Sequence, residues 1–346
     1  MGVLIVSVAL LQFIIGGIIV LLFGFSGLTL FPTFGFLVTL GFEEGPGQAL
    51  SIGKSWEASG FSHAATIGLS FATIGFLFAI FVGVPLTSWM IKKGKASFIR
   101  KISQEVKTGI YEREKGKKAG NLTTHSSTID SLTFHVSLVG FVYILTYLFV
   151  DGITRFMSSE LSQMYWGFFF IWGLIIAYIV RRIMEKLRLD YLIDEESMRR
   201  ITGLSVDFLV IAAITAISLT VVWTFIIPIV IISIVAGATT LIWILYFGQR
   251  LWDEYTLERI TGLYGMETGT IATGVMLVRI ADPNFKTPAA TDLAFGSMIA
   301  LPFMFILFHV MNMPILLGWS LTFTLFLFII GIVAIVAIFE WMSRHQ

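Results

Sequence analysis

The chain alternates long apolar stretches with short polar connections over its 346 residues. A helix needs about 20 apolar residues to cross the hydrocarbon core of a bilayer. This pattern predicts an all-α polytopic membrane protein with about eight transmembrane helices. The predicted spans are 3–23, 64–91, 132–150, 165–181, 204–224, 226–247, 291–313 and 316–341.

Two further apolar segments fit poorly as single spans, because each contains a break rich in small residues. The first hairpin, 28–58, has Gly-Pro-Gly at 45–47, and the second hairpin, 249–283, has its break within 265–272. Glycine is entropically costly inside a helix, and proline lacks the N–H group that a helix needs. We therefore predict that each segment forms a re-entrant hairpin of two short helices.

Basic residues predict the orientation. Sixteen of the 23 Lys and Arg residues lie in or directly beside two connections, 92–131 and 182–203. The positive-inside rule places both connections in the cytoplasm, with the chain multi-pass in the cell (inner) membrane. Counting crossings from there, the first hairpin enters from outside and the second from the cytoplasm, as in an inverted repeat.

The same count divides the chain into two halves with a connection between them. The first half is 1–91, a cytoplasmic basic linker covers 92–131, and the second half is 132–346. Each half then contributes one hairpin to a shared central site. Paired interrupted segments of this kind are the best sequence indication of a transporter binding site.

Composition excludes several other classes of protein. The chain is 56% hydrophobic and only 13% charged, whereas a soluble protein has about 25% charged residues. Cysteine is absent, which rules out disulfides, iron–sulfur clusters and thiol catalysis. No zinc-type His/Glu cluster, P-loop or nucleophile elbow supports an enzyme. A net charge of +1 gives no support for a nucleic-acid partner.

The two breaks predict where the site lies, because irregular backbone at membrane depth persists only where protein buries it or it lines a cavity. Carbonyls at a broken helix end suit Na⁺, expected near Gly45, Gly47 and Gly269, while free amides suit a carboxylate. The alternative is that the small residues only allow close helix packing. The candidate substrate- or ion-binding residues are Glu44, Gly45, Gly47, Gln48, Glu267, Thr268, Gly269, Thr270 and Thr273.

Acidic side chains beside the breaks are a separate indication of function. A carboxylate inside the bilayer costs several kcal/mol unless it is paired or hydrated. Glu44 and Glu267 are the stronger candidates on this ground, and Glu43 is a weaker one. If the breaks are shallow, these glutamates simply face water.

The residues around both breaks resemble a known family. EEGPGQAL (43–50) is similar to a GGHGT-like motif, and METGTIATGVM (266–276) to a GATPTAIANM-like motif, of the sodium–glutamate symporter family (GltS type). The flanking runs 67–86 and 279–303 also resemble segments of that family. The motifs depart where the family's His and Thr become Pro or Gly and Gln at 46–48, and where its Pro becomes Gly269.

The resemblance implies a secondary active transporter that couples Na⁺ to symport of glutamate or a related amino acid or small carboxylate. Na⁺ is then the coupling ion, with no other cofactor. The expected partners are that substrate, Na⁺, the lipid bilayer and further copies of the chain in a homo-oligomer. The alternatives are H⁺- or Na⁺-coupled transport of another organic anion, or a non-transporting receptor or subunit with the same fold.

Family members also have about three scaffold helices before the span that aligns with 3–23. These helices are missing here. Either the start is truncated, or another chain supplies the helices, or the chain is a reduced variant.

Overall fold

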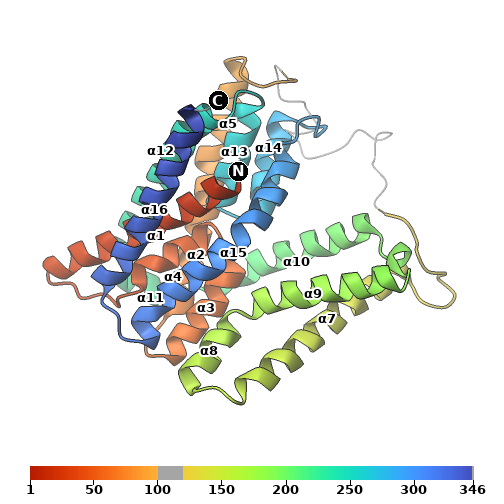
Figure 1. Ribbon diagram of the computed structural model, residues 1–346, viewed down its shortest axis with the longest axis horizontal. Coiled ribbons are helices and arrows are strands. Elements are labelled where there is room, and N and C mark those ends of the chain that lie inside the picture. Colours follow the sequence, from red (N-terminus) through yellow and green to blue (C-terminus); the bar gives the residue numbers. More distant parts are fainter. Residues whose placement is uncertain (100–119, 345–346) are drawn as a thin grey trace. The chain divides into compact units, whose positions relative to one another are not determined.

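The computed structural model describes residues 1–99 and 120–344, and the regular structure throughout these ranges is helical (Figure 1). Six of these helices are long and apolar enough to cross a membrane, or up to seven if one bent pair forms a single span. The prediction of an all-α polytopic membrane protein is confirmed, with fewer candidate spans than the eight predicted. Residues 100–119 of the basic linker lie outside the described part.

The chain forms two compact units, one of Met1–Ile110 with Ala216–Gln346 and one of Tyr111–Thr215. We call them the first and second units and describe each separately. The division into halves at 1–91 and 132–346 concerns an internal repeat rather than these units, and it stays a prediction. The helices of the first unit are α1 (Gly2–Phe25), η1 (Phe34–Phe36), α2 (Leu37–Phe42), α3 (Pro46–Ala58), α4 (Ala64–Phe78), η2 (Ala79–Gly83), α5 (Val84–Lys92), α11 (Leu219–Thr224), α12 (Ile226–Leu251), α13 (Thr256–Glu267), α14 (Ile271–Ala281), α15 (Ala289–Leu316) and α16 (Leu321–Arg344).

The second unit contains α7 (Ser131–Thr154), α8 (Ser159–Gly167), α9 (Phe169–Lys186), η3 (Asp190–Leu192) and most of α10 (Glu195–Ala216). Asp130 caps α7, because its carboxylate accepts the N–H groups of Leu132 and Thr133 at 2.9 and 3.1 Å. The predicted span 165–181 is not one straight helix, since α8 and α9 meet at a bend of 61°.

The predicted span 204–224 is not one continuous helix. Helix α10 ends at Ala216, and the short α11 starts only at Leu219. Between them Ser218 is extended (φ −76°, ψ 110°), and its hydroxyl lies 2.9 Å from that of Thr220.

Helices α4 and α5 form one span of 29 residues, Ala64–Lys92, that continues through the π-helical turn η2. The open end of the first hairpin lies at the start of this span. There the Glu57 carboxylate, near the end of α3, accepts the N–H of Ala65 at 3.2 Å. Trp56 also stacks with Phe61 in the connection to α4. These contacts join the end of α3 to the start of α4.

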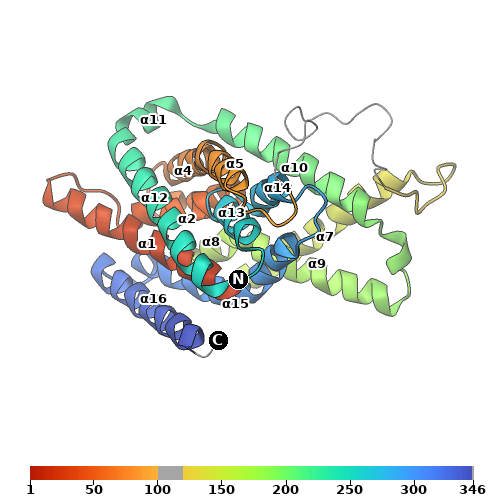
Figure 2. The same cartoon turned by 90° about the horizontal axis from the view of Figure 1, so that it is seen from above.

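The open end of the second hairpin lies at the other end of the same span. Met90 and Ile91 of α5 are buried in one apolar cluster with Leu257 of α13 and Ala281 of α14. Figure 1 shows α2 and α3 beside α4, and α13 and α14 beside α5. Figure 2, turned by 90°, shows α13 and α14 next to α5. The two helix pairs therefore approach from opposite ends of one span.

This arrangement is the one that inverted hairpins require. Helices α13 and α14 contain 12 and 11 residues, about 18 and 16 Å at 1.5 Å per residue, too short to cross a bilayer. Helix α3 has 13 residues and is also too short. The positions of the hairpins in the bilayer, and the repeat itself, stay predictions.

Candidate functional site

The first break separates α2 from α3 at Glu43, Glu44 and Gly45. Gly45 has φ +83° and ψ −175°, a conformation that is essentially restricted to glycine. Pro46 then takes the first helical position of α3, where its missing N–H costs nothing and its fixed φ suits the helix. The Gly-Pro sequence thus ends one helix and starts the next, as predicted.

The second break separates α13 from α14 at Thr268, Gly269 and Thr270. The Gly269 N–H donates to the carbonyl of Met266 at 3.2 Å, which closes the last turn of α13. Thr270 is extended (φ −154°, ψ 172°) and precedes α14. Its hydroxyl lies 3.4 Å from that of Thr273, one turn into α14. Two threonine hydroxyls are therefore presented together at the start of this helix.

The two breaks meet. A Cβ atom added to Gly45 would lie 2.7 Å from the Thr270 methyl carbon and 3.5 Å from the Gly269 carbonyl oxygen. A Cβ atom added to Gly75, near the middle of the α4–α5 span, would lie 2.5 Å from the Thr268 carbonyl oxygen. Only glycine allows backbones to approach this closely. Four helix ends are thus brought together beside the middle of one span.

Acidic side chains surround this contact. Glu267, the last residue of α13, is fully buried, and Glu43 is 8% exposed. Glu44 is half-buried, and the three carboxyl groups lie close enough for their charges to interact. Neither carboxylate oxygen of Glu267 accepts a hydrogen bond from a described residue. Buried polar groups without partners are rare and call for an explanation.

A polar side chain of α1 reaches the same place. The Gln12 amide nitrogen donates to the backbone carbonyl of Glu267 at 3.0 Å and to the Thr240 hydroxyl of α12 at 3.1 Å. Gln12 is fully buried, and its Oε1 atom accepts no hydrogen bond from the described residues. Helices α1 and α12 are therefore tied to the end of α13.

The profile of the sodium/glutamate symporter family matches residues 1–279, a range that includes both breaks. The chain belongs to the sodium/glutamate symporter family. No curated protein and no solved structure matches the chain. As a member of this family, the chain is a transporter and not an enzyme. Its family implies a multi-pass membrane protein that carries a small-molecule substrate and uses Na⁺.

Most of the residues predicted to form the site lie at the contact between the breaks of the symporter. Gly45, Gly269 and Thr270 touch directly, and Thr273 lies beside Thr270. Thr268 is fully buried, and its hydroxyl donates to the Tyr264 carbonyl of its own helix at 2.7 Å. The remaining predicted residues, Glu44, Gly47, Gln48 and Glu267, lie in or directly beside the two breaks. Their roles in binding stay predictions.

The sequence analysis did not identify Gln12 as a site residue, and it ranked Glu43 as a weaker candidate than Glu44. The structure buries Glu43 more deeply than Glu44. A signal for Gln12 was present, because it is the one amide side chain in the apolar run 3–23, and an isolated polar residue in a span is a candidate for function. Its partners lie more than 200 residues away, so the sequence does not indicate what it contacts.

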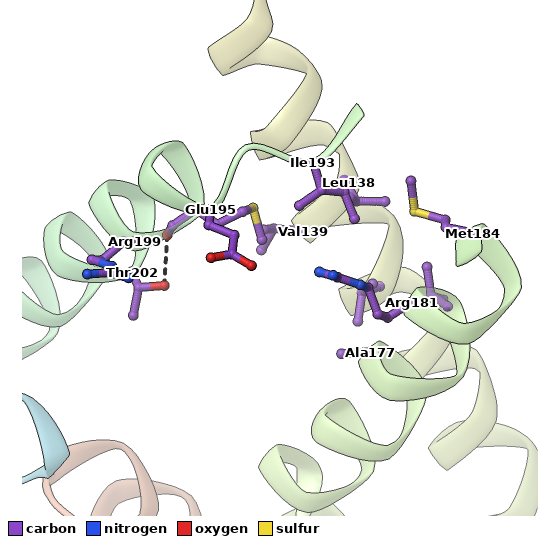
Figure 3. A pocket seen from close by; sticks show the side chains of 12 residues that line it. Leu138, Val139, Ala177, Arg181, Met184, Ile193, Glu195, Arg199 and Thr202 are labelled. Carbon is purple, nitrogen blue, oxygen red and sulfur yellow. Dashed lines mark hydrogen bonds between the residues drawn. The ribbon is translucent and has the colours of Figure 1, made fainter. Parts of the chain in front are cut away.

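The symporter also has a cavity of about 560 Å³ in its second unit (Figure 3). Its walls are mainly aliphatic side chains of α7, α9 and α10, with Arg181, Glu195 and Arg199 among them. Arg181 pairs with Glu185 at 3.1 Å, and Arg199 lies 3.8 Å from Glu196. No residue of either break lines this cavity. Its size alone does not make it the transport site.

Proposed function

We propose that this protein couples the uptake of Na⁺ to that of glutamate or a related amino acid or small carboxylate, which binds between the two breaks. The observation that carries the proposal is the direct contact of the breaks beside the middle of the α4–α5 span. Irregular backbone at that depth is tolerated where it lines a transport site. The family supplies the expectation of Na⁺ and glutamate.

The four helix ends supply complementary groups. Helices α3 and α14 both start at the contact, and the first turn of a helix has N–H groups without acceptors in the helix. Two such helix starts suit the two carboxylates of a glutamate-like substrate. Glu44 is half-buried beside them and is suited to pair with a substrate ammonium group.

The other two helix ends suit the coupling ion. Helices α2 and α13 end at the contact, so their last carbonyl groups lie near Gly45 and Gly269. Such carbonyls carry partial negative charge and are hard oxygen ligands, as Na⁺ prefers. Anion-binding and cation-binding helix ends therefore lie at one place, which favours binding of substrate and ion to the same state.

Uptake of labelled glutamate into proteoliposomes tests the proposal. An inward Na⁺ gradient should drive uptake, and an equal K⁺ gradient should not. If both ligands favour one state, Na⁺ must raise the affinity for substrate and substrate must raise the affinity for Na⁺. Equal substrate affinity in Na⁺ and K⁺ would exclude Na⁺ symport. Binding without any Na⁺-dependent uptake would instead favour a receptor with this fold.

Substitutions at the breaks test the location of the site. Gln48→Ala and Thr270→Ala each remove a polar group and should weaken substrate binding by about 1–3 kcal/mol if the group is desolvated on binding. Gly47→Val should weaken it further, because a β-branched side chain blocks close backbone approach. Thr215→Ala, at an exposed threonine of α10, is the control. Normal binding and transport in all three break variants would mean that the small residues serve only helix packing.

A further inference from the structure

The end of α13 is an unfavourable place for an isolated carboxylate. Glu267 is the last residue of that helix and is fully buried. The C-terminal end of a helix carries partial negative charge, which disfavours an anion there. The charges that interact with it belong to other carboxylates, those of Glu43 and Glu44. Each of these features is compensated if a cation binds beside Glu267.

No basic side chain among the described residues provides that compensation. Arg259 of α13 pairs with Asp292 of α15 at 2.7 Å. On the helices packed against α13, Arg250 lies over the ring of Tyr246, and Arg279 lies over the ring of Phe285. Lys92 is exposed in the last turn of α5. The remaining titratable groups near Glu267 are Glu43, Glu44 and the Tyr264 hydroxyl.

The orientation of the Gln12 amide is fixed by its partners. The backbone carbonyl of Glu267 can only accept a hydrogen bond, so the amide NH₂ group must face it. Turning the amide over would place two acceptors against each other. The Oε1 atom therefore points away from the two groups that accept from the amide nitrogen, and it is fully buried without a hydrogen bond among the described residues. Gln12 thus adds a third unpartnered oxygen to the two of Glu267.

We propose that Gln12 and Glu267 bind the coupling cation of the symporter through side-chain oxygens, in a site additional to the backbone carbonyls at the breaks. Carboxylate and amide oxygens are hard ligands. No group of three or more His, Asp or Glu side chains in residues 1–99 and 120–344 is arranged to hold a metal ion. The family implies that this cation is Na⁺.

This inference rests on the proposed function and can be tested without transport. Purified protein in detergent is heated in choline chloride and in increasing NaCl, without substrate. A cation that binds only the folded state raises the apparent melting midpoint in a saturable manner. We expect this rise for the wild-type protein. Glu267→Gln should melt at or above the wild-type midpoint in choline, because a buried charge is removed, and should show no rise with Na⁺.

Gln12→Leu should raise the half-saturating Na⁺ concentration by at least about tenfold, the loss expected for one charge-assisted contact. Glu258→Gln is the matched control. Glu258 is also fully buried on α13, but its carboxylate accepts the N–H and hydroxyl of Ser97 at 2.8 and 3.2 Å. Its variant should lose stability in both salts and keep the wild-type half-saturating Na⁺ concentration.

The outcomes separate this inference from the proposed function. If the wild-type protein shows no Na⁺ response in melting or in uptake, Na⁺ symport itself fails. If the wild-type protein responds and both Glu267→Gln and Gln12→Leu keep the same half-saturating Na⁺ concentration, only the side-chain site is refuted. Stabilisation by acid in place of Na⁺ also refutes it. If Glu267→Gln does not fold, an unchanged half-saturating Na⁺ concentration in Gln12→Leu is sufficient to refute the side-chain site.

Discussion

Gly45→Ala tests directly whether the two breaks touch in the protein. The substitution adds one methyl group at a residue with φ +83°. The new Cβ atom would lie 2.7 Å from the Thr270 methyl carbon. The substitution should therefore lower the stability of the folded protein for two reasons, the unfavourable backbone conformation at the first break and the overlap with Thr270 at the second break.

The structure gives a magnitude for each penalty. Placing a side chain in a glycine-only backbone region costs about 1–3 kcal/mol. Overlap with a packed neighbour costs typically about 1–3 kcal/mol more. Thr270→Ser keeps the hydroxyl and removes the methyl group that the new Cβ would meet. In the Gly45→Ala protein, Thr270→Ser should therefore restore the stability lost to the overlap but not the stability lost to the backbone conformation. The expected coupling free energy between these two positions, 225 residues apart in sequence, is about 1–3 kcal/mol.

The assay is a double-mutant cycle of apparent melting midpoints in detergent. The double variant Gly45→Ala with Thr270→Ser should melt above Gly45→Ala alone. Gly60→Ala is the control, because Gly60 has φ +102° and a Cβ atom there would meet nothing within 4 Å. Gly60→Ala should lower the melting midpoint because of its backbone conformation, and Thr270→Ser should not change the size of that loss. Equal coupling for Gly45 and Gly60 would refute the contact between the breaks.

Two further predictions concern topology and pH. The chain has no native cysteine, so a membrane-impermeant maleimide should label Ser59→Cys on intact cells, and Asn284→Cys and Thr108→Cys only after the membrane is opened; labelling of 59 and 284 from the same side would show that the hairpins are not inverted. Asp194 precedes α10 and caps it, because its carboxylate accepts the N–H of Ser197 at 2.8 Å. Hydrogen bonds from Ser197 hold the pKa of Asp194 below its ordinary value. The cap therefore stabilises α10 fully above the unfolded-state pKa of Asp194, and this stabilisation is lost as the pH falls through the lower folded-state pKa. The melting midpoint should fall less steeply at acid pH in Asp194→Asn, and an unchanged slope would assign the decline to another group.

Local chemistry made much of the fold predictable. The Gly-Pro-Gly sequence at 45–47 excludes a continuous helix, and the structure breaks there. The apolar runs 3–23 and 226–247 become α1 and α12 with ends shifted by up to four residues. These features depend on residues that are neighbours in sequence, and backbone geometry determines them without help from distant contacts.

Features that depend on distant partners could not be predicted in the same way. Gln12 and Glu267 are 255 residues apart, and only folding shows that they meet. The break between α10 and α11 was missed because the run 204–224 is apolar enough for one helix, whereas the backbone is extended at Ser218. Glu43 and Glu44 are adjacent, so only the direction of the chain at the break decides which one is buried deeper.

The α4–α5 span has a consequence for the separation of the two breaks. Each hairpin is attached at one end of this span, through Glu57 and Ala65 at the start and through Ile91 and Leu257 at the finish. The number of residues in the span therefore sets how far each break reaches toward the other. Inserting one residue would lengthen the span by about 1.5 Å and rotate one end by about 100° relative to the other. The length of Ala64–Lys92 should consequently tolerate very little change.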